Sequence, residues 1–137
     1  MFNLKWLANL YFLMMIIFWS NCANCMIIEN LSLGIFKGNI EYVQGAIDAG
    51  ESVSERLYSK ELKEWIEPLP FAISRLNYAS DEDDLCTRLG IIALLISSGA
   101  KINKKSYHYV EKIKNKNIRN TTKELLTTKV IEEFTEL

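Results

Sequence analysis

Side chains that could act as acids, bases or nucleophiles are few, and no recognisable motif groups them. The one histidine, His108, lies between Tyr107 and Tyr109, a setting more typical of a surface or packing residue than of a catalyst. No Ser, Cys or Thr nucleophile has a companion base placed near it by such a motif, as nucleophilic catalysis requires. We therefore expect no enzymatic activity and no catalytic residue.

The sequence also gives little support for a metal-binding or phosphate-binding site. Residues 81–84 (Asp-Glu-Asp-Asp) offer carboxylates, but they lack the spaced ligands and the turn glycine of a calcium loop. Cys22 and Cys25 form a Cys-x-x-Cys sequence, yet no strand precedes it and no helix-capping residue follows it. The glycines stand singly, so there is no Gly-rich phosphate loop. We expect no metal and no cofactor.

Charge is divided unevenly along the chain, although the net charge is −1. Acids outnumber bases between residues 29 and 84, and bases outnumber acids between residues 101 and 129. Two oppositely charged solvated faces explain this division, and a surface that steers a charged partner is the alternative. We do not expect nucleic acid as a partner, because the chain also carries an export signal.

The first 25 residues have the order of a secretory signal peptide. Lys5 supplies a short positive region, residues 10–19 are an unbroken apolar run, and a polar stretch of small residues follows as far as Cys25. Ten helical residues span only about 15 Å, roughly half of the hydrocarbon core of a membrane. We expect residues 1–23 to be a signal peptide, with an uncleaved N-terminal membrane anchor as the alternative.

The fate of the cysteines depends on where the leader is cut. Cleavage after Ala23 or after Cys22 is compatible with the residues at the junction. Lipidation is disfavoured because Asn21 and Asn24 precede the two leader cysteines. After cleavage at Ala23, Cys25 would remain in an oxidising compartment together with Cys86, and the sequence leaves their pairing open.

Residues 31–54 predict a helix, a tight turn and a second, antiparallel helix. Gly38 and Asn39 form the turn, with the glycine closing the first helix and the asparagine capping the second. Apolar residues then recur three and four positions apart, as one face of a helix requires. These residues are Ile40, Val43, Ala46 and Ile47. Gly50 ends the second helix.

Residues 67–103 repeat this plan. Pro68 suits the first turn of a helix, and a second apolar face ends just before Gly99. The segments 48–54 (DAGESVS) and 97–103 (SSGAKIN) match in register through the glycine and the aliphatic residue three positions later. We expect six residues to form the core between the two units. They are Ile47, Leu69, Ala72, Ile92, Leu95 and Ile96.

Both units resemble ankyrin repeats. Residues 67–73 (EPLPFAI) correspond to the family's T-P-L-H-x-A-A, residues 38–43 (GNIEYV) to its turn and second helix, and residues 99–103 (GAKIN) to its G-A-D-V-N ending. The resemblance implies an all-α fold, an ankyrin-like stack of antiparallel helix pairs (an α-solenoid). Residues 24–137 would form one domain, with repeats at about 27–54 and 67–103. A non-repetitive helical bundle is the alternative.

The sequence departs from the family pattern in spacing and in two residues. Gly50 and Gly99 are 49 positions apart, against about 33 in the family. The excess fits residues 55–64, between the repeats, and residues 75–86, between the helices of the second repeat. Glu67 and Pro70 replace the family's Thr and His, so the hydrogen bonds of those residues must be absent or replaced.

The last 34 residues, 104–137, do not show the motif. They predict two helices, at about 106–114 and 121–134, joined near residues 115–117. Asn120 or Thr121 would cap the second of them. A degenerate terminal cap repeat is the expected identity, because a stack of repeats must end on a unit with a polar outer face.

The resemblance implies that the chain binds another protein. The leader and the composition point to the bacterial periplasm or envelope, where such a module would neutralise a toxin or assist an exported enzyme through its concave surface. A membrane-anchored structural scaffold of an envelope complex is the alternative. Membrane contact is expected only through an uncleaved leader.

The family pattern also implies which residues face the partner. The two residues after the small pair of each first helix point to the concave side, and those before the T-P-L-H position form the tip of the finger. The expected protein-binding residues are therefore Phe36, Lys37, Lys63, Glu64, Ile66, Ser74 and Arg75. Two alternatives remain: Phe36 packs under residues 77–84, or the partner uses the basic segment 101–119.

The leader gives a first testable prediction. We expect the mature chain to start near Asn24 and to lie outside the cytoplasm, because the charged, apolar and small-residue regions occur in the order that signal peptidases recognise. N-terminal sequencing of the protein from cell fractions measures this. An intact Met1 on a soluble cytoplasmic form would refute it.

Overall fold

The structure, a computed structural model, describes the backbone of residues 4–135 and the side chains of residues 4–17 and 31–129. Helices account for 70 % of the chain. The elements in order are α1 (Leu4–Lys37), α2 (Ile40–Asp48), β1 (Leu57–Ser59), β2 (Glu64–Ile66), α3 (Pro68–Ser74), the 3₁₀ helix η1 (Arg75–Tyr78), α4 (Glu82–Ser97), α5 (Lys104–Glu111) and α6 (Lys116–Thr135).

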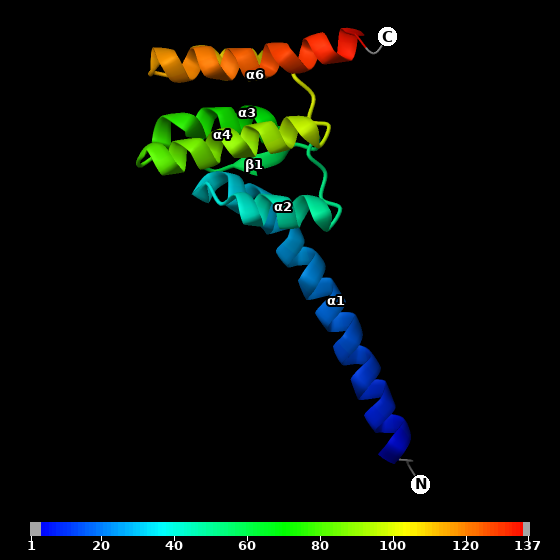
Figure 1. Cartoon of the computed structure of the whole chain (residues 1–137). Helices are drawn as coiled ribbons and strands as arrows, with labels where there is room; N and C mark the ends of the chain where they lie inside the picture. The colour runs from blue at the N-terminus through cyan, green and yellow to red at the C-terminus, as the bar shows by residue number, and fades with distance from the viewer. Residues whose placement is uncertain (1–3, 136–137) are drawn as a thin grey trace.

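The helices pack as three pairs in successive layers (Figure 1). The pairs are α1 with α2, α3 with α4, and α5 with α6. Between layers, α3 contacts both α1 and α5, and α4 contacts both α2 and α6. One row of helices is thus α1, α3 and α5, and the second row is α2, α4 and α6.

The first turn forms as the sequence predicts. Gly38 has φ of +71°, a conformation that favours glycine. The side chain of Asn39 accepts hydrogen bonds from the backbone N–H groups of Glu41 and Tyr42, so it caps α2. A further glycine lets the two helices approach closely, because a Cβ on Gly34 would lie 2.9 Å from Val43 Cγ2.

The second pair begins and ends at predicted residues. Pro68 occupies the first position of α3, where its missing N–H is not needed. After α4, Gly99 has φ of +98°, and Asn103 caps α5 in a capping box with Ser106. The start of α4 lies in the segment 75–86, which has no counterpart in the family pattern. Asp81 caps this helix, because its side chain accepts a hydrogen bond from the backbone N–H of Asp84.

A buried arginine joins the first layer to the second. Arg88 of α4 is only 6 % exposed. Its guanidinium donates to the carbonyl oxygens of Ile35 and Phe36, at 3.2–3.4 Å, and to the carboxylate of Asp84 at 3.2 Å. A Cβ on Gly38 would lie 2.9 Å from this guanidinium, so the glycine also makes room for it. The last carbonyls of α1 are therefore satisfied by a side chain of the next layer.

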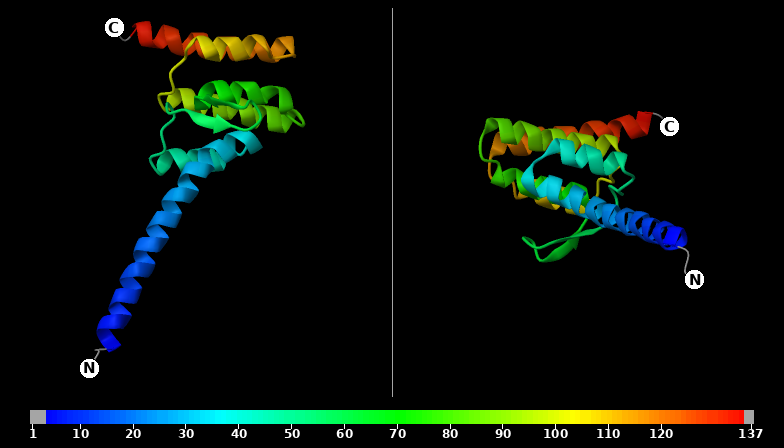
Figure 2. Two further views of the ribbon diagram at one scale, coloured as in Figure 1. Left: turned by 180° about the vertical axis from the view of Figure 1, so that it is seen from behind. Right: turned by 90° about the horizontal axis from the view of Figure 1, so that it is seen from below.

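The expectation of an all-α fold is met except for one β-hairpin. Strands β1 and β2 pair antiparallel, with Leu57 opposite Ile66, Tyr58 opposite Trp65 and Ser59 opposite Glu64. The hairpin occupies the segment expected to lengthen the finger between repeats. Figure 2 (right) shows it projecting from the side of the helical layers.

The last helix begins earlier than the sequence indicates. α6 starts at Lys116, and its first turn is capped by Asn115, whose side chain accepts from the N–H groups of Asn117 and Ile118. The prediction that Asn120 or Thr121 caps this helix was wrong. Several Asn and Thr residues follow one another here, and the pattern alone did not show which of them precedes the first turn.

The predicted core residues lie inside the molecule. Leu69, Ala72, Ile92, Leu95 and Ile96 are buried, and Ile47 is half-buried against them. Leu31 and Ile35 at the end of α1 belong to the same core, as does Leu126 of α6. The core is therefore continuous through all three layers.

The first helix is longer than the sequence predicts. α1 runs without interruption from Leu4 to Lys37, so part of the predicted leader and the first helix of the domain form one helix that projects away from the layers (Figure 1). Large apolar side chains between Leu4 and Ile17 are exposed along this projection. Among the described residues, no helix has the length and apolar character needed to cross a membrane.

Arg88 is the subject of a second prediction. Arg88→Met should lower the free energy of unfolding by about 2–4 kcal/mol, because it removes the guanidinium that donates to the carbonyl groups of Ile35 and Phe36 and that balances the charge of Asp84. Chemical denaturation followed by circular dichroism measures this. Arg56→Met is the matched control: Arg56 is exposed and forms a surface ion pair with Glu67 at 3.6 Å, worth at most about 1 kcal/mol. Equal stability of the two variants would contradict the role of Arg88.

Candidate protein-binding surface

The hairpin lies beside the row of helices α1, α3 and α5 and leaves a hollow on each side. The α1 groove, of about 760 Å³, is lined by Leu31, Ser32, Leu33, Phe36, Glu51, Ser52, Glu55, Arg56, Leu57, Tyr58, Lys60, Glu61 and Trp65. The α5 pocket, of about 450 Å³, is lined by Leu62, Glu64, Ser74, Asn77, Tyr78, Lys105, His108, Tyr109 and Lys112.

Two aromatic side chains stand exposed at the α1 groove. Tyr58 and Trp65 are cross-strand partners, 49 % and 62 % exposed, with their rings edge to face at a centroid distance of 5.7 Å. Leu33, which is also exposed, lies on the α1 wall of the groove. Exposed apolar side chains that gather at a groove mark a candidate interaction site, and aromatic residues are the type that most often carries binding energy.

A carboxyl group with an unsatisfied oxygen lines the same groove. Oε2 of Glu51 is buried and has no hydrogen-bond partner. Burial raises the pKa of Glu51, and a hydrogen bond with the backbone of Leu31 opposes this shift. The groove therefore combines apolar side chains with one buried carboxyl oxygen that no described protein group satisfies.

Two of the predicted binding residues pack against each other. The guanidinium of Arg75 lies 4.4 Å from the ring centroid of Phe36 and 4.4 Å from that of Tyr78. Phe36 is half-buried, and Arg75 links it to Tyr78, a residue of the segment under which Phe36 was alternatively expected to pack. Burial lowers the pKa of Arg75, and its Nε has no hydrogen-bond partner.

Two other predicted binding residues are buried. The expectation of a partner-facing position was wrong for Ile66, whereas Ser74 still lines the α5 pocket. Ile66 is fully buried, because its position in β2 directs the side chain into the core. Ser74 is 9 % exposed, and its hydroxyl donates to the carbonyl oxygen of Phe71 at 2.6 Å. Position in the repeat pattern did not reveal these local constraints.

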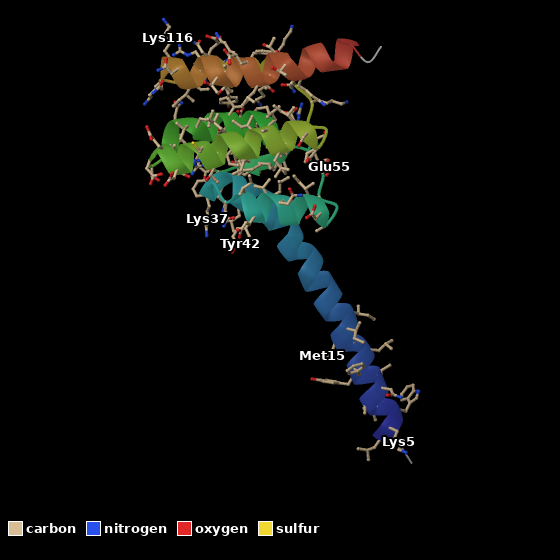
Figure 3. All side chains as sticks on the ribbon, viewed as in Figure 1. Lys5, Met15, Lys37, Tyr42, Glu55 and Lys116 are labelled. Atoms are coloured by element: carbon tan, nitrogen blue, oxygen red, sulfur yellow. The ribbon has the colours of Figure 1, made fainter. Side chains whose placement is uncertain are left out.

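The two predicted lysines are exposed but line neither hollow. Lys37 ends α1, and Figure 3 shows it on the side of the first layer that faces away from α3 and α4. Lys63 lies in the turn of the hairpin with φ of 52°, an uncommon conformation for a residue with a Cβ. The seven predicted residues therefore do not form one surface.

Glu64 is the predicted residue at the centre of a polar network. The hydroxyl of Tyr109 donates to Glu64 Oε1 at 2.5 Å, and Lys105 Nζ lies 3.5 Å from Glu64 Oε2. The Tyr109 hydroxyl lowers the pKa of Glu64, with a smaller effect from Lys105. Burial and the carboxylate together raise the pKa of Tyr109 to about 12.

This network ties the hairpin to α5. Lys105 Nζ also donates to the carbonyl oxygen of Trp65 at 3.5 Å. Next to it, Asn77 of η1 donates through Nδ2 to the carbonyl oxygen of Lys112 and accepts from the N–H of Lys114. The walls of the α5 pocket are thus held by side chains from three elements.

Sequence reasoning missed Tyr58 and Trp65 of the hairpin, and it included four residues of α5 and its C-cap only within the alternative basic segment 101–119. The four are Lys105, His108, Tyr109 and Lys112. Their spacing of three and four positions was the available signal, because it places them on one face of a helix. The strands were missed because each has only three residues.

The described residues hold no group of three or more His, Cys, Asp or Glu side chains that would bind a metal ion. His108 packs edge to face against the Tyr109 ring at 5.4 Å. Cys86 is exposed and forms no disulfide with any described side chain. The Cys25 side chain lies outside the described residues, so its pairing with Cys86 is still open. The geometry of this surface suits binding of another molecule.

The Tyr109–Glu64 hydrogen bond gives a third prediction. Tyr109→Phe should raise the pKa of Glu64 toward its ordinary value, because the largest cause of its depression is lost. A carboxyl whose pKa is lowered by folding stabilises the fold above its unfolded pKa and loses this effect as the pH falls through the folded pKa. The variant should therefore lose less stability on acidification than the wild type.

Carboxylate titration by NMR, with thermal unfolding at several pH values, measures both effects. Tyr107→Phe, an exposed tyrosine of the same helix, is the control and should titrate like the wild type. An unchanged pKa of Glu64 in Tyr109→Phe would contradict the assignment.

Comparisons with family models, with curated proteins and with solved structures find no match for this chain. The resemblance to ankyrin repeats therefore rests on the residues quoted above.

Proposed function

We propose that the chain is an exported protein-binding module that takes its partner on the surface around the hairpin. The observation that carries the proposal is the exposed Tyr58–Trp65 pair at the α1 groove. An aromatic pair of this size, left in water beside an apolar groove, gains most when a partner covers it. The groove is open and broad, which suits a protein segment more than a small molecule.

An ankyrin-like stack is the proposed architecture. Its support is the arrangement of three helix pairs in two rows, together with the glycine turns at residues 38 and 99. The hairpin stands beside the row that would be the inner one. In such stacks the surface next to the inner row is where residues can vary without disturbing the core.

The bacterial periplasm or envelope is the proposed location of the module. Its support is the order of charged, apolar and small residues in the first 25 positions. A partner there would be a toxin that the module neutralises or an exported enzyme that it assists. No enzymatic activity of its own is part of the proposal.

The second candidate is a membrane-anchored scaffold of an envelope complex. One observation favours it: α1 passes without a break from the leader into residues Leu31 and Ile35 of the core. A leader that stayed attached would hold the domain through a continuous helix. The size of the mature protein separates the two candidates.

Affinity capture with matched variants tests the binding surface. The tagged chain is expressed in its own host as wild type, as Trp65→Ala and as Tyr42→Ala, and proteins captured from the envelope fraction are identified by mass spectrometry. Tyr42 is the control because it is 49 % exposed and lies outside both hollows, on the outer side of the first layer (Figure 3). We expect a protein that is captured by the wild type and by Tyr42→Ala and is lost with Trp65→Ala.

The captured protein is then purified for a direct measurement. Trp65→Ala should weaken its affinity by at least about tenfold, which is about 1.4 kcal/mol, while the melting temperature stays that of the wild type. A partner that binds all three forms equally would show that another surface is used. Capture of no protein at all by the wild type would count against the function itself.

A further inference from the structure

The face of α5 that looks toward the hairpin carries an unusual set of side chains. Lys105, His108, Tyr109 and Lys112 follow one another at spacings of three, one and three residues, so they share one side of the helix. All four line the α5 pocket. Cationic and aromatic side chains gathered around a hollow recognise negative charge more readily than apolar surface.

The acid inside the pocket is already matched. Glu64 receives the Tyr109 hydroxyl on one oxygen and faces the Lys105 ammonium on the other. These two groups satisfy the carboxylate and balance its charge. Within the pocket lining, the remaining charge is that of Lys112.

Lys112 has no carboxylate within ion-pair distance among the described residues. Its ammonium lies 5.4 Å from the centroid of the Tyr109 ring, so the ring positions it at the pocket. The backbone of the same residue is fixed by Asn77, which donates to its carbonyl oxygen. The Lys112 charge also helps to lower the pKa of Glu64, but that carboxylate lies beyond ion-pair distance and is already bonded to Tyr109 and Lys105. The Lys112 ammonium is therefore free to form a direct ion pair with a further anion.

We propose that the α5 pocket binds a glutamate or aspartate side chain of the partner protein, with the Lys112 ammonium as its counter-charge and the His108 ring and the Asn77 amide as its walls. The inference rests on the proposed function, since it assigns one contact of the same partner. The Tyr58–Trp65 pair would contact apolar groups of the partner. The α5 pocket would bind one acidic side chain and so fix the position of the partner along the surface.

The surroundings favour a single carboxylate over a polyanion. Asn77 also lines a neighbouring hollow that contains two acids, Asp81 and Glu82, and one base, Lys114. A nucleic-acid strand would bring further phosphates against these acids, whereas one side chain would not. Lys105 is already paired with Glu64, so the pocket offers little more than one unit of uncompensated positive charge.

The test uses a peptide as the probe. The full chain, labelled with ¹⁵N in a non-ionic detergent, is titrated with acetyl-Ala-Ala-Glu-Ala-Ala-amide and with the same peptide carrying Gln in place of Glu. The Glu peptide should shift the amide signals of Tyr78, His108 and Lys112, and its affinity should fall as salt is added. The Gln peptide should bind about tenfold more weakly.

Matched variants distinguish binding in the α5 pocket from non-specific electrostatic attraction of the peptide to surface lysines. Lys112→Gln removes the charge but keeps a polar side chain at this position, and it should weaken binding of the Glu peptide about tenfold. Lys116→Gln, an exposed lysine of α6 outside the pocket lining that points away from the other layers (Figure 3), should bind like the wild type. Unchanged signals elsewhere in the spectrum show that each variant is folded.

Two results would overturn the inference: equal shifts from both peptides, or wild-type affinity of Lys112→Gln for the Glu peptide. Either result leaves the proposed function standing if capture of a partner still depends on Trp65. Conversely, the Glu peptide could bind while no captured protein depends on Trp65. That result would support the acid-binding pocket and contradict the proposed function. Inorganic phosphate is titrated as well. If phosphate shifts the same signals at lower concentration than the peptide, the ligand of the pocket is a phosphate group and the inference of a carboxylate ligand is wrong.

Discussion

The buried guanidinium of Arg88 is the contact on which the surface around the hairpin depends. It satisfies the last carbonyl groups of α1 from the next layer, and the carboxylate of Asp84 balances its charge. A cation at this end of a helix is favoured by the helix dipole as well. Because Phe36 forms part of the wall of the α1 groove and its carbonyl is held by Arg88, the groove keeps its shape only while the first two layers stay in register.

The two sides of the hairpin differ in character because of how each is held. Toward α5, the hairpin is bound by Glu64 and by the contact of Lys105 with the Trp65 carbonyl, and the pocket there is smaller and more polar. Toward α1, the Tyr58 and Trp65 rings face a broader and more apolar hollow. One short hairpin therefore divides the surface into two parts. The apolar part would provide contact area for a partner, and the polar part would orient the partner.

Features governed by neighbouring residues were predictable from the sequence, and those governed by distant contacts were not. The turn at Gly38 and Asn39 and the start of α3 at Pro68 were predicted because each is fixed by the conformation of a single residue. The burial of Ile66 was missed because it depends on strand alternation, which directs Trp65 outward and Ile66 inward. Arg88 looked like any other charged helix residue until the carbonyls of α1, more than fifty positions earlier in the chain, came to lie beside it.

Because α1 is unbroken, it fixes both the distance between the leader and the domain and the rotation of the domain about the helix axis. An α-helix turns by about 100° for each residue, so a form that kept its leader would have the direction of the hairpin set by the number of residues between the apolar run and Leu31. Adding or removing a single residue in that interval would swing the Tyr58–Trp65 pair about a quarter of a turn around the helix axis. In an anchored form, the azimuth of the hairpin would thus be encoded in the length of one helix.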